Sequence, residues 1–114
     1  MAAGTHNLII DKGSDFAFQV NLKQNGVAVD LTNYSARAQM RATRTSTSAL
    51  VTSFNCSVLS PATDGKINIS LPNANTSNVE PGRYYYDLEI YTANNATVTR
   101  LLQGDVTVTP EVTR

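Results

Sequence analysis

The chain has 114 residues, and its nine Lys and Arg residues balance its nine Asp and Glu residues. This length fits one domain, residues 1–114, with its own hydrophobic core, while the zero net charge gives no attraction to nucleic acid or to an anionic membrane. No stretch approaches the roughly 20 apolar residues of a membrane span, and a single cysteine excludes an intramolecular disulfide bond.

The first third of the chain predicts short strands joined by tight turns. Residues 6–10 are expected to form a first strand. Residues 15–22 alternate apolar and polar side chains, which is typical of a strand with one buried face. Asn25-Gly26 then predicts a type I′ hairpin turn, because both residue types tolerate positive φ. Residues 27–31 are expected to return as the paired strand.

The middle of the chain continues this pattern. Residues 35–41 contain residue types that favour helix, yet small or apolar side chains alternate there with Arg and Gln, which predicts a strand. Residues 50–58 are expected to form one or two strands, and residues 66–71 a further strand. Residues 72–79 are polar and short, so we expect at most a single helical turn there.

The last hairpin, residues 80–108, carries the clearest strand pattern. Asn94-Asn95 supplies residues that tolerate the positive φ of a tight turn. Gly104 interrupts the alternation of the return strand, which is a common mark of a β-bulge. One face of the first strand is expected to be buried and to carry Tyr84, Tyr86, Leu88 and Ile90, and the opposite face to carry Tyr85, Asp87, Glu89 and Tyr91.

A tyrosine at the start of this hairpin predicts the fold class. In immunoglobulin-like sandwiches a tyrosine two residues before the second cysteine position turns a corner between sheets, and its hydroxyl bonds to upstream backbone. Tyr84 is the candidate for this structural corner, and Tyr86 stands at the cysteine position. Turn signals recur about every eight to twelve residues. We therefore predict an all-β fold, an immunoglobulin-like two-sheet β-sandwich of about seven to eight short antiparallel strands.

Charged and aromatic side chains on two strands form a candidate interface. The arginines of residues 35–44 stand in a stretch without acidic residues, and two carboxylates point outward from the final hairpin. If these faces belong to different subunits, they are expected to form bidentate ion pairs; pairing within the chain, or solvation, is the alternative. Exposed aromatic residues are enriched in interface cores. The candidate interface residues are Arg37, Arg41, Arg44, Tyr85, Asp87, Glu89 and Tyr91.

The sequence offers little for catalysis or metal binding. His6, the only histidine, stands near the chain end, where a solvent-exposed side chain is a simpler interpretation than a general base. Cys56 lies on an alternating apolar face, where a cysteine usually behaves as a small buried hydrophobe. The spacings of calcium loops and zinc sites are lacking. We therefore expect a non-enzymatic protein without catalytic residue, metal or cofactor.

Three stretches carry a resemblance to known proteins: AGTHNLIIDKGSDFAFQVNL, GVAVDLTNYSARAQMR and GRYYYDLEIYTANNATVTRLLQGDVTVTPEVTR. Together they resemble small immunoglobulin-like virion proteins of tailed bacteriophages, cyanophages among them, over nearly the whole chain. The Asp-Leu-Thr-x-Tyr motif at residues 30–34 is also similar to the N-terminal domain of a phage baseplate protein that carries receptor-binding proteins. That protein continues into a shaft or fibre-binding domain, whereas this chain ends at Arg114, which argues against the same adaptor role.

The resemblance implies a structural protein of the virion, synthesised in the host cytoplasm. An accessory component of the tail, baseplate or fibre attachment region is the leading expectation. A capsid decoration protein that stabilises the head is the close alternative, and a receptor- or carbohydrate-binding module is a third class. The expected partners are other virion proteins, contacted by multiple copies or by a homo-oligomer, with neither nucleic acid nor membrane among them.

Overall fold

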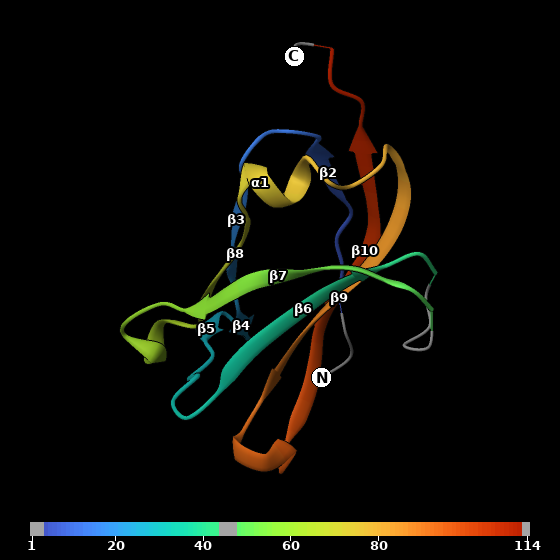
Figure 1. The fold of residues 1–114 in the computed structure, drawn as a ribbon. Helices are drawn as coiled ribbons and strands as arrows, with labels where there is room; N and C mark the ends of the chain where they lie inside the picture. Colours follow the sequence, from blue (N-terminus) through green and yellow to red (C-terminus); the bar gives the residue numbers. More distant parts are fainter. Residues whose placement is uncertain (1–3, 44–47, 113–114) are drawn as a thin grey trace.

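The computed structural model describes residues 4–43 and 48–112, and these residues are mostly β-strands (Figure 1). The predicted all-β class is confirmed. Short helical segments lie only between strands: η1 (Ala62–Asp64), α1 (Asn73–Thr76) and η2 (Ala93–Asn95). In chain order the strands are β1 (Gly4–Thr5), β2 (Leu8–Asp11), β3 (Phe16–Asn21), β4 (Lys23–Gln24), β5 (Val27–Ala28), β6 (Ser35–Arg41), β7 (Leu50–Val58), β8 (Lys66–Leu71), β9 (Gly82–Tyr91) and β10 (Val98–Thr109).

One curled sheet contains eight of these strands. Its order is β1-β10-β9-β6-β7-β8-β3, with β2 also paired to β10, while β4 and β5 form a separate two-stranded hairpin. The curl occurs at β7, which changes partner along its length. Residues 50–54 of β7 pair with β6, and residues 55–58 pair with β8. In Figure 1, β7 accordingly runs across the molecule between β6 on one side and β8 with β3 on the other.

The two N-terminal strands correct the expectation of a wholly antiparallel fold. β1 and β2 both run parallel to β10, whereas β9 and β10 pair antiparallel, as do β6 and β9. Parallel neighbours need a long connection, and here almost the whole chain separates β2 from β10. Alternation along a single strand carries no information on such a distant partner.

Gly104 does not form the predicted bulge. The register between β9 and β10 shifts between Arg100 and Leu102, so the bulge lies at Leu101. Gly104 itself stays in register with Tyr86. A Cβ added at this glycine would lie 2.8 Å from the carbonyl carbon of His6, and closer still to its oxygen. Glycine is therefore required because the segment between β1 and β2 passes directly against the backbone of β10.

The Asn25-Gly26 turn and the single helical turn agree with the prediction, whereas the connection at Asn94-Asn95 differs from the tight turn that was expected. Asn25 and Gly26 have φ values of 53° and 80°, and they form the two-residue loop of the β4–β5 hairpin. Asn94 and Asn95 also have positive φ, 58° and 55°. The connection they belong to is wider than a tight turn, because it is closed by a bond from the Thr92 N–H to the Thr97 carbonyl. The expected single helical turn is α1.

The core is built from alternate residues of β6, β8, β9 and β10, together with β2 and part of β3. Three aromatic rings extend across it: the Phe16 and Phe54 centroids are 6.2 Å apart, as are those of Phe54 and Tyr86. No helix among the described residues has the length and apolar character needed to span a membrane. The buried apolar residues include Ile10, Val20, Ala38, Met40, Ile67, Ile69, Leu71, Leu88, Ile90, Val106 and Val108.

Candidate functional site

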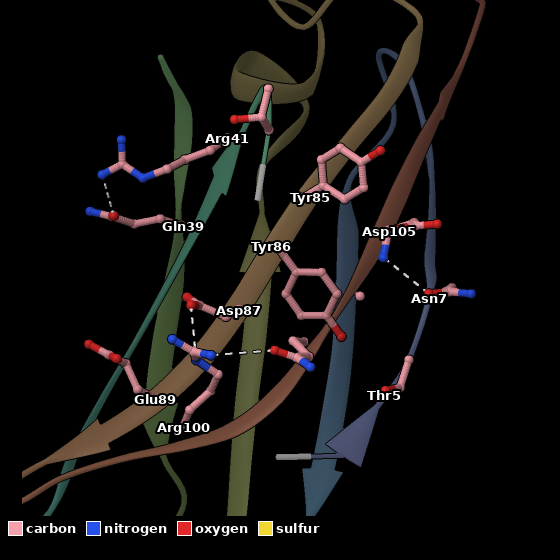
Figure 2. A pocket seen from close by; sticks show the side chains of 13 residues that line it. Thr5, Asn7, Gln39, Arg41, Tyr85, Tyr86, Asp87, Glu89, Arg100 and Asp105 are labelled. Atoms are coloured by element: carbon pink, nitrogen blue, oxygen red, sulfur yellow. Dashed lines mark hydrogen bonds and ion pairs between the residues drawn. The ribbon is translucent and has the colours of Figure 1, made fainter. Parts of the chain in front are cut away.

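A polar groove of about 500 Å³ lies on the outward-facing side of β6, β9 and β10, beside the N-terminal strands (Figure 2). We call it the polar groove. Its lining includes four of the predicted interface residues: Arg41 of β6, and Tyr85, Asp87 and Glu89 of β9. Arg37 and Tyr91 lie outside the lining. Arg44 lies outside the described residues.

The strand register explains why these side chains meet. Across β6, β9 and β10 the outward residues form three rows, because directly opposite residues in antiparallel pairs share a face and lie about 5 Å apart. The rows are Arg41–Tyr85–Asp105, Gln39–Asp87–Gln103 and Arg37–Glu89–Arg100.

Arg37 and Glu89 are paired within the chain. The Arg37 Nε donates a hydrogen bond to Glu89 Oε1, and the same guanidinium also bonds the Asn95 Oδ1 at 3.2 Å. Its central carbon lies 4.4 Å from the centre of the Tyr91 ring, a cation–π contact. Arg37 and Glu89 therefore pair within the chain rather than between subunits, and both charges already have partners.

The charges inside the polar groove are also held by the chain itself. The Arg100 Nε lies 3.4 Å from Asp87 Oδ2. Arg41 donates to the Ser48 carbonyl and to Gln39 Oε1, both at 2.8 Å. In Figure 2, Tyr85 and Asp105 lie on the neighbouring strands β9 and β10, where they stand opposite each other. The groove is thus lined by two tyrosines, Tyr85 and Tyr86, and by polar side chains that the chain itself holds in place.

The sequence interpretation missed the side chains that β10 and the N-terminal segment supply. Arg100, Gln103 and Asp105 line the groove, and the Asn7 Oδ1 accepts a hydrogen bond from the Asp105 N–H at 3.0 Å. Because the bulge was expected at Gly104, the sequence did not predict which residues of β10 face outward. The adjacent apolar pair Leu101-Leu102 is the signal that marks the true bulge, because it breaks the alternation.

Neither His6 nor Cys56 has the surroundings of a catalytic group. His6 is exposed and its ring centre lies 5.5 Å from that of Phe18. Burial raises the pKa of the Cys56 thiol to about 11, so the thiol stays protonated and unreactive near neutral pH. Within residues 4–43 and 48–112, no three His, Cys, Asp or Glu side chains are grouped so that they could hold a metal ion.

Ionisation of the Asp87 carboxyl, which lies in the groove, is disfavoured. Partial burial raises its pKa above the ordinary 3.8, and this effect outweighs the opposing charge of Arg100. Because the folded state then binds the proton more tightly than the unfolded state, Asp87 lowers stability once it is ionised and ceases to do so as the pH falls through its folded pKa.

We therefore predict a pH-dependent difference between the natural protein and Asp87→Asn. As the pH is lowered from about 7 to about 4, the natural protein should gain stability relative to the variant. Urea unfolding of both proteins at a series of pH values measures this difference. A difference that stays constant, or that changes in favour of the variant on acidification, contradicts the raised pKa.

Comparisons with known proteins place the chain in no family. No family model matches it, and no curated protein sequence matches it. Among solved structures, it is similar in fold to InlP of Listeria monocytogenes, with 14% sequence identity and a TM-score of 0.49. That match covers 94% of this chain and 28% of the InlP chain, so the chain spans less than one third of the protein it resembles.

Proposed function

We propose that this chain is a non-enzymatic structural protein of a tailed-phage virion, which acts by binding a neighbouring virion protein. The sequence resemblance over nearly the whole chain supports the virion setting. The polar groove is the observation that supports binding rather than catalysis. The leading location is an accessory position on the tail, baseplate or fibre attachment region.

The polar groove has the properties of a docking surface for protein. Tyr and Arg are the residue types that most often dominate interface energies, and the groove places Tyr85 beside Arg41. The side chains around them are already held by hydrogen bonds and an ion pair. Less conformational entropy is lost on binding when side chains are fixed beforehand. Charges of both signs line the groove, which favours a partner with the complementary pattern.

We also infer that the curled sheet is an immunoglobulin-like two-sheet sandwich. In such folds one sheet contains strands B, E and D and the other contains C, F and G. Assigning β3, β8 and the end of β7 to B, E and D, and β6, β9 and β10 to C, F and G, agrees with the observed neighbours. The Tyr84 hydroxyl donates to the Glu80 carbonyl at 2.6 Å, the bond expected of a tyrosine corner. Tyr86, at the cysteine position, is buried.

Immunogold electron microscopy of purified parent particles, with antibody against this domain, tests the virion proposal. Label confined to the tail or its tip supports the leading location. Label over the whole head would instead make the chain a capsid decoration protein. Absence of label, with the protein also absent from gels of purified particles, would remove the virion proposal.

A charge reversal in the polar groove tests the docking surface. Particles assembled with Arg41→Glu should contain at least about tenfold fewer copies of the protein, which corresponds to roughly 1.4 kcal/mol of binding free energy. The isolated variant should still fold, at a cost of about 2–3 kcal/mol, since it loses the bonds to Ser48 and Gln39 and the attraction of Arg41 to the Asp87 carboxylate. Quantitative mass spectrometry of purified particles measures the copy number.

Arg83→Glu is the matched control, because Arg83 is exposed on the same strand as Tyr85 and lies outside the groove lining. Its incorporation should equal that of the natural protein. Arg37 is unsuitable as a probe, since its reversal would also break the pair with Glu89. Normal incorporation of Arg41→Glu, or equal loss with Arg83→Glu, would rule out the polar groove as the docking surface.

A further inference from the structure

The strand β3 lies at one end of the curled sheet and has a partner on one side. It pairs with β8 over its whole length, and within the described residues no strand pairs with its other edge. Strand edges of this kind offer a row of backbone N–H and C=O groups to another chain. Natural proteins usually protect such edges.

The hydrogen-bond pattern shows which residues offer these groups. The Leu22 N–H donates to the Gly65 carbonyl at 2.7 Å, in the register that continues the β3–β8 pairing. In an antiparallel pair the hydrogen-bonded positions alternate, so the even-numbered residues of β3 bond β8. The odd-numbered residues therefore direct their N–H and C=O groups away from the sheet. Their side chains are exposed as well: these residues are Ala17, Gln19 and Asn21.

The bonds on the far side of β8 support the same assignment. The Leu59 N–H donates to the Lys66 carbonyl at 2.9 Å, so even-numbered residues of β8 bond β7 and odd-numbered residues bond β3. Both bonds therefore indicate the same alternation along β3. The even-numbered residues bond β8, and the odd-numbered residues Ala17, Gln19 and Asn21 direct their backbone groups outward.

This edge lacks the usual protection against strand pairing. β3 is six residues long, FAFQVN, and contains no charged residue, proline or glycine. At the opposite end of the sheet, the strands β1 and β2 are two and four residues long and β2 ends in the charged Asp11. Short strands and charges are the common devices that block edges, so protection is present at one end and missing at the other.

We infer that β3 is a self-association surface, through which two copies of this chain pair their β3 strands antiparallel about a twofold axis. A twofold axis pairs the strand with an identical strand and brings residues near the axis close to their own copies, so an uncharged strand is the kind that tolerates self-pairing. Centring the pairing on Gln19 sets Ala17 opposite Asn21 of the partner subunit. The three outward residues of each copy then exchange about six backbone hydrogen bonds.

Side-chain contacts favour the same register. Residues opposite each other in an antiparallel pair share a face, so Phe18 lies beside the partner's Val20 on the core-facing side. Phe18 is half-buried in the isolated chain, and aromatic residues pair favourably with β-branched residues across strands. The polar groove lies on β6, β9, β10 and the N-terminal segment, and none of its lining residues belongs to β3.

Sedimentation velocity of the isolated protein tests this inference without any particle, and so independently of the proposed virion function. The natural chain should show a monomer–dimer equilibrium between about 10 and about 500 μM. Gln19→Lys places two positive charges opposite each other and should weaken the dimer at least tenfold. Asn68→Lys is the matched control: Asn68 stands opposite Gln19 on β8, inside the sheet, and its variant should dimerise as the natural chain does.

A cysteine cross-link tests the register itself. In a Cys56→Ala background, Gln19→Cys should form a disulfide-linked dimer under mild oxidation, because hydrogen-bonded pairs have Cα atoms about 5.5 Å apart. Ala17→Cys should not, because the two copies of this residue stand about four residues apart along the paired strands. A natural chain that stays monomeric at about 500 μM, or a Gln19→Lys variant that dimerises normally, overturns the inference.

Discussion

Tyr86→Ala should lower the free energy of unfolding by about 3–5 kcal/mol. The side chain of Tyr86 is 5% exposed, and its ring contacts Phe54 edge-on with centroids 6.2 Å apart. Its hydroxyl donates to the His6 carbonyl at 2.6 Å. The substitution therefore removes a large apolar volume, an aromatic contact and a hydrogen bond that holds the N-terminal segment. Urea unfolding followed by circular dichroism measures the loss.

Two further variants separate these contributions. Tyr86→Phe removes only the hydroxyl and should cost about 1 kcal/mol. Burial raises the pKa of Tyr86 to about 12, so the hydroxyl remains a donor throughout the pH range of the measurement. Tyr85→Ala, on the opposite face of β9, should cost far less than Tyr86→Ala. Equal losses for Tyr85→Ala and Tyr86→Ala would contradict the assignment of Tyr86 to the buried face of β9, and a larger loss for Tyr85→Ala would mean that the two faces are reversed.

The elements predicted correctly are those whose pattern is local. The alternation within residues 35–41 and 66–71 predicts β6 and β8 with their observed bounds. The Asn25-Gly26 pair predicts a turn because its positive φ values belong to those two residues alone. In each case the interactions that determine the structure involve residues close together in the sequence, so a short stretch of sequence is enough to predict it.

The features that were missed depend on contacts between distant parts of the chain. The parallel pairing of β2 with β10 joins opposite ends of the sequence. The change of partner within β7 depends on both β6 and β8. At the candidate site, the sequence predicted the outward face of β9 but not its registry with β10, so the pairing of Arg100 with Asp87 was not foreseen. Side-chain periodicity shows which face of a strand is buried. Which residues of the neighbouring strand lie opposite depends on the register of the pairing.

Gly104→Val should displace the N-terminal strands and lower the free energy of unfolding by about 3 kcal/mol. Any Cβ at this position meets the His6 carbonyl group, and it would also lie 2.9 Å from the Asn7 Oδ1. The backbone of β10 cannot yield easily, because β9 fixes it from the other side. The segment between β1 and β2 must therefore move, which breaks the bond from Tyr86 to His6 and the bond from Asp105 to Asn7.

Hydrogen exchange combined with thermal unfolding distinguishes this local effect from general destabilisation. Amides of β2 should lose protection in Gly104→Val before those of β6 and β8 do, because β2 depends on β10 for its pairing. Thr107→Val is the matched control, since Thr107 is an exposed residue of the same strand, and it should leave β2 protected. Full protection of β2 in Gly104→Val, with unchanged unfolding, would mean that the close approach of His6 does not determine the need for glycine. Loss of protection confined to the N-terminal strands would instead show that position 104 requires glycine because of a backbone contact rather than because of a bulge.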